Sequence, residues 1–442
     1  PDVSGIQLRT FVPRVGWLLL AGAARRLFRR GEWAVGDDRR RVLVLSSSYP
    51  RFAGDHAGGF VASVAERWAR GARVTVVAPW DGRAPRAEDD AVTGLAVRRF
   101  RYAPRARWHR VAYGDGMEEN LAASLPARIW LAPFVAAFVL RAVIEARRAD
   151  CVVSHWLAPA GLAGAITSAL WRKPHLLIEH GGGLAVLRGG RRGGARARVL
   201  RGILRRTHRV VCVSAALRDD LVAASAVAGA PLTAAAVPVI PMGVAAGAPR
   251  DAGADAPGRA RTVLFLGRLV AVKGAGTLLG AMKHLPEATL TIAGGGPLAA
   301  DLRARASALG DRVAFAGTVR GDAKQAALRA ARVLAVPSVV LPGGRTEGFP
   351  VVVLEGMAAG CVVVASDAGG ISEVIQDGWN GLLVKPGDAR ALADRIQWVF
   401  DHPALADAIA ARARASARAH DADAVADRLW REVGKTFSCS GR

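Results

Sequence analysis

Several residue types that carry familiar chemistry are scarce in this chain of 442 residues. Only four residues are cysteine, namely Cys151, Cys212, Cys361 and Cys439, and none lies in a CxxC spacing. A disulfide framework and a cysteine-bound zinc are therefore not expected, and a reducing compartment fits. A strand-linked GxGxxG with a downstream acid is also missing, which disfavours a Rossmann dehydrogenase.

The chain also lacks an apolar run of the roughly 20 residues that cross a bilayer as a helix. The nearest candidates, Val15–Ala24 and Ile129–Leu140, are too short. Arginines at positions 25, 26, 29 and 30 follow the first run at once, a pattern that fits a basic amphipathic helix on a membrane surface. A solvated extension is the alternative, and a cleaved signal peptide is a third. We expect residues 1–40 to form this basic extension of a cytoplasmic protein, with contact to the inner face of the membrane left open.

What the chain does have is a large excess of positive charge. Its 61 Lys and Arg outnumber its 37 Asp and Glu, for a net charge of +24, and only six of the cations are lysine. Such a field attracts nucleotide diphosphates, acidic lipid headgroups or nucleic acid. Nine arginines between residues 188 and 209 form either a solvated helix or a face for an anionic membrane or lipid-diphosphate acceptor. Because no aromatic residues alternate with them, nucleic acid is not an expected partner.

Short apolar runs alternate with helical patterns along most of the chain. The runs are typical of parallel strands buried on both faces, and they lie at residues 42–45, 74–78, 151–153, 176–178, 210–213, 263–266, 288–293, 312–316, 333–336, 361–365 and 381–384. The predicted fold class is α/β, with two Rossmann-like doubly wound domains facing a cleft. We expect an N-terminal domain over 41–240, a linker opening a C-terminal domain over 241–403, and a closing helix and tail over 404–442.

Loops at the strand ends should define the site, because open α/β sheets bind ligands at the carboxyl ends of their strands. Arg268 and Lys273 follow one strand and precede a helix, which suits a pair of cations that clamp a diphosphate. Lys273 stands out because lysine is so rare here, although solvated surface charge is the alternative. Gly294 and Gly295 follow the next strand and either admit a ligand close to the backbone or make a tight turn.

Two glutamates eight residues apart, Glu347 and Glu355, flank an expected helix start. Pro350 suits a first helical turn, and the backbone N–H groups from Gly348 to Val351 would form an anion site. Eight helical steps separate the two carboxylates by roughly 12 Å, enough to grip hydroxyls at two ends of one ligand. The alternative is a dipole-stabilised Glu347 and a solvated Glu355, but an unpaired carboxylate among the apolar neighbours of Glu355 is costly.

In their order and spacing these motifs resemble the retaining GT-B glycosyltransferases of family 4, nucleotide-sugar transferases with an E-x7-E motif. The resemblance covers about residues 41–400. It rests on the glycine-rich loop over 54–59, Gly267-Arg268-Leu269 with Lys273-Gly274, the segment 292–297, Glu347-Gly348-Phe349-Pro350 with Glu355, and the segment 365–381.

The resemblance implies roles for these residues. Glu355 would bind the ribose and Glu347 the donor sugar, while Arg268 and Lys273 would stabilise the diphosphate leaving group. His180, at a strand end, would lie beside the sugar and help with protonation or positioning. Backbone contacts to the donor would come from Gly58, Gly59, Gly294, Gly295, Gly348, Phe349, Pro350 and Val351. Because no Asp-x-Asp motif lies in a suitable loop, neither a metal nor a resident cofactor is expected.

The predicted function is a retaining transfer of a hexose from a UDP- or GDP-sugar to a glycan or polyprenyl-linked acceptor, in bacterial envelope or exopolysaccharide synthesis. A sugar-nucleotide epimerase on the same fold is one alternative, and it would turn over the donor without an acceptor. Another is a non-catalytic protein that binds anionic lipid or nucleic acid. Its binding would depend strongly on salt and would not respond to Glu347→Gln.

Overall fold

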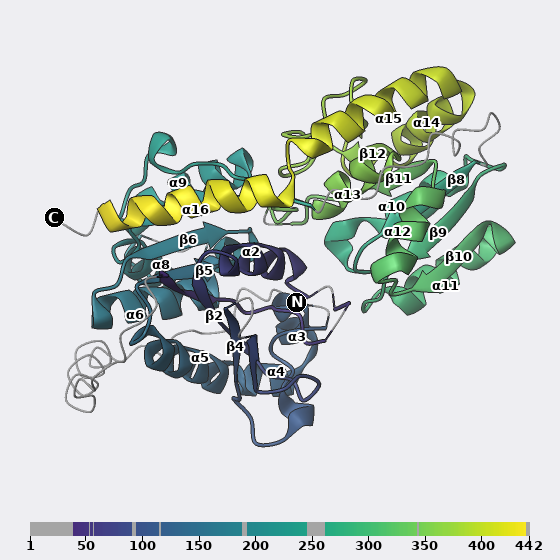
Figure 1. Ribbon diagram of the computed structural model, residues 1–442. Helices are drawn as coiled ribbons and strands as arrows, with labels where there is room; N and C mark the ends of the chain where they lie inside the picture. Colours follow the sequence, from purple (N-terminus) through teal and green to yellow (C-terminus); the bar gives the residue numbers. More distant parts are fainter. Residues whose placement is uncertain are drawn as a thin grey trace.

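The computed structural model describes residues 39–438 except 53, 56, 91–93, 115, 188–191, 245–260 and 343. The expected membrane-surface helix before residue 39 and most of the expected linker therefore lie outside the described residues. The described chain folds into two α/β lobes (Figure 1), each built on its own sheet.

The first lobe contains a seven-stranded sheet in the order β3-β4-β2-β1-β5-β6-β7. Its strands are β1 (Arg41–Leu45), β2 (Arg73–Pro79), β3 (Ala87–Asp90), β4 (Leu95–Phe100), β5 (Cys151–His155), β6 (His175–Glu179) and β7 (Arg209–Cys212). Alternate residues of β1 enter different clusters, Val42 and Val44 on one face and Leu43 and Leu45 on the other. Burial on both faces explains why this strand reads as a continuous apolar run.

The sequence analysis missed β3 and β4. These two strands pair with each other antiparallel, and β4 then extends the parallel sheet beside β2. Their sequences, AEDD and LAVRRF, carry charged residues and are not continuously apolar. β3 lies at the edge of the sheet, and β4 is next to it. A strand at an edge is not covered on both sides and so loses the signal on which the prediction relied.

The second lobe contains a six-stranded, all-parallel sheet in the order β10-β9-β8-β11-β12-β13. Its strands are β8 (Thr262–Leu266), β9 (Thr289–Ala293), β10 (Val313–Gly317), β11 (Val333–Val336), β12 (Val362–Ser366) and β13 (Leu382–Val384). The sequence analysis predicted all six strands, with their ends correct to within about two residues. Both sheets agree with the predicted fold class, two doubly wound α/β domains.

Helices cover both faces of each sheet. In the first lobe they are α2 (Gly59–Ala69), α3 (Met117–Ala123), α4 (Leu125–Ile129), α5 (Leu131–Ala146), α6 (Leu162–Trp171), α7 (Gly182–Leu187), α8 (Ala195–Leu204) and α9 (Ala215–Ala228). In the second they are α10 (Ala275–Met282), α11 (Ala299–Ala306), α12 (Gly321–Ala330), α13 (Val351–Ala359), α14 (Ala389–Asp401) and α15 (Pro403–Arg418). Short helical turns add η3 (Ala106–Trp108), η4 (Leu157–Gly161), η5 (Ala234–Ala236), η7 (Ala271–Lys273) and η8 (Ser307–Arg312).

The closing helix expected from residue 404 onward is in fact two helices, α15 and α16 (Ala422–Ser438). The break allows the chain to cross between lobes: α15 packs on the second lobe through Ala406 and Ile409, whereas α16 enters the core of the first. Trp68 of α2 donates its indole N–H to the carbonyl oxygen of Ala426 at 2.9 Å, and Figure 1 shows α16, in yellow, lying across the first lobe. A second chain crossing therefore ties the lobes together.

Candidate active site

Close backbone contacts between two strand-end loops of the second lobe bring Arg268 and Lys273 to one edge of the sheet. A Cβ on Gly294, after β9, would lie 1.8 Å from the carbonyl oxygen of Gly267, after β8. Only glycine fits at such a distance. Packing therefore explains why residue 294 is glycine, a question that the sequence left open between a tight turn and a ligand contact. Gly295, the next residue, has more room, because a Cβ there would lie 3.2 Å from Thr318 Oγ1. Lys273 ends the short turn η7 that follows Arg268.

Lys273 and Glu347 form an ion pair at this edge. Lys273 Nζ lies 2.8 Å from Glu347 Oε1, and the side chains are 18% and 11% exposed. The pair is not aligned for a hydrogen bond, and Glu347 Oε1 has no hydrogen-bond partner among the described residues. A carboxylate held by charge but free to accept hydrogen bonds is suited to receiving hydroxyl groups from a ligand.

The expected helical geometry between Glu347 and Glu355 is wrong. Helix α13 begins at Val351, and Pro350 is its N-cap residue rather than part of its first turn. Glu347, Gly348 and Phe349 lie in the preceding loop, so only half of the eight steps follow a helix and the 12 Å estimate does not apply. In this loop Glu347 lies beside Lys273.

The two lobes touch at the backbone within this loop and again further along the second lobe. A Cβ on Gly348 would lie 2.1 Å from the carbonyl oxygen of His180 in the first lobe, and one on Gly181 would lie 3.4 Å from Gly348 Cα. Further along, Glu373 of the second lobe accepts hydrogen bonds from the backbone N–H groups of Ala215 and Ala216, at 2.6 and 3.0 Å. These N–H groups open helix α9, where a carboxylate is favoured by the helix dipole.

His180 therefore lies at the contact between the lobes, beside Gly348. Its ring packs against Phe60 and Trp156, with centroids 4.8 and 4.9 Å away, and its Nε2 is 2.9 Å from His155 Nδ1. Burial, together with the neighbouring His155, holds the pKa of His180 well below its usual value. The imidazole is consequently neutral near pH 7, which favours a hydrogen-bonding role over that of a charged acid.

Glu179, directly before His180, organises this strand end. The carboxylate is fully buried, and it accepts backbone N–H groups from Gly181 at 2.8 Å, Leu184 at 3.2 Å and Leu157. Burial raises the pKa of Glu179 to about 7, although these donors oppose the shift. Glu179 thus fixes the backbone that presents His180, and the sequence analysis did not single it out.

Arg268 reaches the first lobe rather than standing free. Its Nη1 lies 3.6 Å from Glu119 Oε2 on α3, and the other oxygen of Glu119 is 2.6 Å from Arg345 Nη2. Arg345 also pairs with Glu118, at 2.8 Å. Two arginines of the second lobe therefore meet two glutamates of the first, and this interlobe cluster of Glu118, Glu119, Arg268 and Arg345 adjoins the Arg268–Lys273 loop.

Glu355 faces a different cation from Glu347. It lies in α13 and its Oε1 is 2.6 Å from Lys324 Nζ of α12. The ammonium group of Lys324 stabilises a carboxylate that would otherwise lie unpaired among apolar neighbours. Lys324 was not named as a candidate, although its rarity as a lysine is the same signal that pointed to Lys273.

Several buried polar atoms at this edge of the second lobe have no hydrogen-bond partner among the described residues. They are Arg268 Nη1, Ser338 Oγ, Thr346 Oγ1 and Glu347 Oε1. Arg268 Nη1 and Glu347 Oε1 nevertheless face the charged groups of Glu119 and Lys273, and Ser338, Thr346 and Glu347 share the one segment between β11 and α13.

Gly58 and Gly59 lie at the start of α2, on the first lobe. Gly58 is the N-cap residue with φ +65°, and a Cβ there would lie 2.1 Å from the carbonyl oxygen of Ser48. Gly59, by contrast, has open space around it. The structure explains Gly58 by packing alone and leaves both proposed phosphate contacts as predictions.

Among the described residues, no three His, Cys, Asp or Glu side chains converge to form a metal site. No helix in the described ranges combines the length and apolar character needed to cross a membrane.

The fold and the interlobe arrangement define a class, the GT-B glycosyltransferase fold. Solved structures of this fold match nearly the whole chain: a sucrose-phosphate synthase from Thermosynechococcus elongatus (TM-score 0.69, 24% identity, 90% of this chain and 100% of that one) and HepE of Anabaena in complex with UDP and glucose (TM-score 0.67, 20% identity, 89% and 99%).

Sequence comparison gives the family. Residues 60–245 match the model of Glycosyltransferase Family 4, and residues 260–402 match that of Glycosyl transferases group 1. The chain belongs to this family of group 1, family 4 glycosyltransferases. The phosphatidyl-myo-inositol mannosyltransferase of Mycobacterium leprae is 37% identical over 190 residues, 42% of this chain and 49% of that protein. The matched region thus spans about half the length of this curated relative.

Proposed function

We propose that the protein transfers a hexose from a UDP- or GDP-sugar to a glycan or lipid-linked acceptor, with retention of configuration. The observation that carries this proposal is the Lys273–Glu347 pair at 2.8 Å, beside the backbone contact between Gly348 and His180. A cation for the diphosphate and a carboxylate for the sugar then lie on one lobe, and the backbone of His180, which carries a neutral imidazole, meets that lobe from the other.

The proposed reaction breaks the bond between the sugar C1 and the diphosphate oxygen. Lys273 and Arg268 stabilise the negative charge that develops on the leaving diphosphate, a form of electrostatic catalysis that grows toward the transition state. The acceptor hydroxyl attacks C1 from the face that the diphosphate leaves, and its proton passes to the departing phosphate oxygen. Glu347 and His180 hold the sugar hydroxyls by hydrogen bonds, and Glu355 binds the ribose.

The proposed acceptor is attached to a lipid. The name of the Mycobacterium leprae relative describes transfer of mannose to phosphatidyl-myo-inositol, and the strong positive charge of this chain suits an anionic acceptor. Such an acceptor would be met at the cytoplasmic face of a membrane, in the synthesis of a bacterial envelope glycan.

A nucleotide screen tests the donor half of the proposal. The melting temperature should rise with either UDP or GDP and with one of the corresponding sugars, because a ligand that binds only the folded state stabilises it by mass action. Glu347→Gln should weaken the response to the sugar nucleotide more than the response to the free diphosphate. A protein that responds to no nucleotide would overturn the proposal.

The acceptor half needs a transfer assay. Incubation of the cognate donor with lipid extract should yield a glycosylated lipid whose anomeric configuration, read by NMR, equals that of the donor. Inverted product would contradict the retaining mechanism, and turnover of the donor to an isomeric sugar nucleotide without acceptor would identify an epimerase instead.

A further inference from the structure

Helix α5 is apolar on its exposed side as well as on its buried side. Phe134, Phe138 and Ala142 point into the first lobe and are fully buried. On the opposite side Leu140 is 61% and Ile144 41% exposed, and Ile129 of the preceding α4 is 61% exposed. Leu140 and Ile144 are four residues apart and so form an apolar stripe along α5, and Ile129 adds to it from the short helix directly before.

Little charge interrupts this stripe. Arg141 and Glu145 are the charged residues of α5, and they pair with each other at 2.6 Å. Leu125, at the start of α4, extends the apolar surface and is 65% exposed. A helix that is apolar all round is ordinarily buried in a core or in a membrane, and neither holds for the outer side of α5 within the described part of the chain.

A basic loop with tryptophan borders the stripe. Arg101, Arg105, Arg107 and Arg110 lie at residues 101–110, and the last three are exposed. Arg101 and Arg110 donate hydrogen bonds to backbone carbonyl oxygens of the same loop. Trp108 of this loop stacks on Trp130, between α4 and α5, with ring centroids 5.7 Å apart. The guanidinium of Arg105 lies over Trp108 at 5.2 Å. Tryptophan with arginine beside an apolar surface is typical of the membrane–water boundary.

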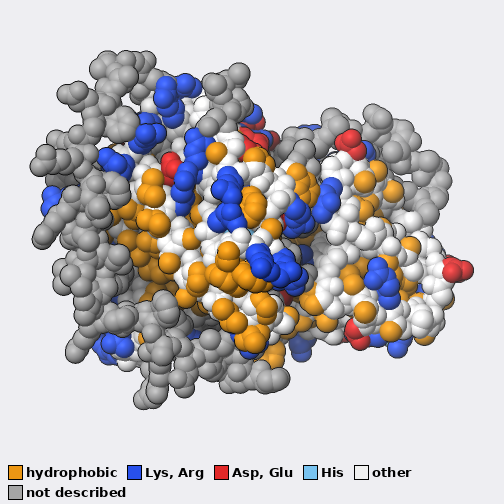
Figure 2. Space-filling view, turned by 90° about the horizontal axis from the view of Figure 1, so that it is seen from below, with side chains coloured by type: hydrophobic (Ala, Val, Ile, Leu, Met, Phe, Trp, Pro, Cys, Tyr) orange, Lys and Arg blue, Asp and Glu red, His pale blue; other side chains and the backbone are white. Residues whose placement is uncertain are grey.

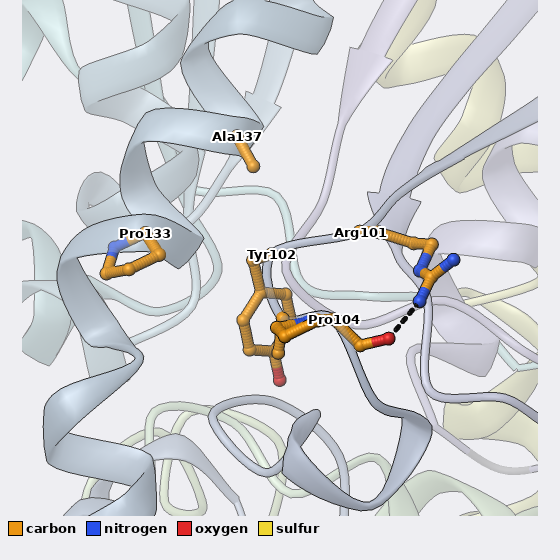
Figure 3. Close-up of a pocket in the computed structure, with 6 residues that line it drawn as sticks. Arg101, Tyr102, Pro104, Pro133 and Ala137 are labelled. Carbon is orange, nitrogen blue, oxygen red and sulfur yellow. Dashed lines mark hydrogen bonds between the residues drawn. The ribbon is translucent and has the colours of Figure 1, made fainter.

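The loop and the helix also border a shallow, open depression of the surface. Figure 3 shows Pro133 and Ala137 of α5 facing Tyr102 and Pro104, with Arg101 at the side and hydrogen-bonded to Pro104. Figure 2 looks at the molecule from the side on which α4 and α5 lie, and apolar side chains gather there with Lys and Arg among them. We call this surface, formed by Leu125, Ile129, Leu140, Ile144 and the loop 101–110, the α4–α5 face.

We propose that the α4–α5 face docks on an anionic lipid bilayer. The apolar stripe enters the boundary between headgroups and acyl chains, and the arginines of the loop meet the lipid phosphates, as in interfacial helices. The charge complementarity favours a lipid surface over a second copy of this basic chain, whose own loop would repel it.

The position of the face also suits delivery of a lipid-bound acceptor. Helix α3 carries Glu118 and Glu119, which contact Arg268 and Arg345 in the interlobe cluster. Ser124 ends α3 and caps α4, its Oγ accepting the backbone N–H of Ala127 at 3.4 Å. The docking face therefore begins at the start of α4, directly after the helix that carries Glu118 and Glu119 of the interlobe cluster.

Vesicle sedimentation with the full chain tests the proposal, and it needs neither donor nor turnover. Wild-type protein should bind vesicles that contain anionic phosphatidylglycerol and should bind pure phosphatidylcholine much more weakly. Leu140→Asp with Ile144→Asp should lower the partition coefficient at least tenfold, because two apolar side chains no longer enter the bilayer. Replacement of Arg105 and Arg107 by Gln should cost about fivefold for each arginine, and less at high salt.

Matched controls come from exposed apolar residues elsewhere. Leu405→Asp in α15 and Val227→Asp in α9, which are 55% and 46% exposed, should leave vesicle binding unchanged. Melting temperature and nucleotide response should be the same in all these variants, which separates loss of docking from loss of folding or of the donor site. Hydrogen exchange should show vesicle protection of residues 125–144 and none of 389–418.

Three outcomes would overturn the proposal. One is undiminished vesicle binding by the Leu140→Asp, Ile144→Asp variant. Another is loss of binding on removal of residues 1–38 alone, with the stripe variant unaffected. The third is a dimer in solution that the stripe variant dissociates while vesicle binding persists, which would assign the face to a second copy of the chain.

Discussion

The two lobes share an architecture but differ in how they hold several of their ionisable groups. The first lobe buries His155, His175 and Glu179 completely, so that their pKa values move to about 3, 3 and 7. The second lobe holds Lys273–Glu347 and Lys324–Glu355 as partly exposed ion pairs at the edge of its sheet. Burial keeps a group neutral and fixed, whereas an ion pair near solvent can exchange one partner for a ligand. The first lobe therefore holds these neutral groups in fixed positions, and the second lobe offers charged groups that can bind a charged ligand.

The largest test of this contrast removes a cation of the second lobe. Lys273→Ala should lower kcat/KM by about 10³-fold, because a preorganised donor to the developing charge is lost. The measurement is steady-state transfer with the cognate donor. Lys283→Ala, at an exposed lysine that ends α10, is the matched control and should be near wild type. Equal losses in the two variants would mean that net charge, not position, matters.

The next test lowers the pH and acts on the first lobe. His155, His175 and His180 have folded pKa values below the ordinary 6.5, so the unfolded state binds protons first as the pH falls. Each costs about 1.4 kcal/mol of stability per pH unit below 6.5. Glu179 has the opposite sign: its raised pKa favours the folded state as the pH falls from about 7 toward its ordinary value.

The lowered pKa values of the three imidazoles outweigh the raised pKa of the one carboxyl, so these four groups together lower the stability of the first lobe as the pH falls from 6 to 5. Hydrogen exchange should show β5 and β6 losing protection over this range before β11 and β12 do. His175→Gln should flatten the dependence, while His402→Gln, at an exposed position, should leave it unchanged. Simultaneous loss of protection in both sheets would contradict the assignment to the first lobe.

A third test acts where the lobes meet. Gly348→Ala places a Cβ 2.1 Å from the carbonyl oxygen of His180, so backbone must shift and Glu347 moves relative to the sugar. A displacement of about 1 Å at a reacting centre costs about a hundredfold in kcat/KM. Gly434→Ala in α16, where the added carbon meets open space, should keep full activity and gain up to about 1 kcal/mol of stability. If Gly348→Ala kept wild-type activity, the backbone contact between Gly348 and His180 would not be needed for catalysis.

The smallest expected effect concerns the interlobe cluster. Glu119→Gln removes the carboxylate that lies 3.6 Å from Arg268. A diphosphate that binds Arg268 then no longer has to compete with this negative charge. A partly exposed pair of this kind is worth roughly 0.5–1 kcal/mol, which predicts two- to fivefold tighter nucleotide binding by calorimetry. Glu118→Gln, which touches Arg345 alone in the cluster, should change the affinity less. Weaker binding in Glu119→Gln would instead make Glu119 a ligand contact.

The sequence determined the doubly wound fold and most strands, because a strand buried on both faces needs a continuous apolar run. It also pointed to Lys273 and Glu347, since a rare lysine at a strand end and a glutamate before a helix are visible along the chain. It missed the edge strand β3 and its neighbour β4, whose charged residues interrupt any such run.

Tertiary structure alone decided which charges pair. Glu355 meets Lys324, Arg268 meets Glu119, and α16 returns to the first lobe, contacts that join residues 31, 149 and hundreds of positions apart in the chain. A pattern along the sequence reports local burial, whereas the distance between two side chains depends on how whole elements pack.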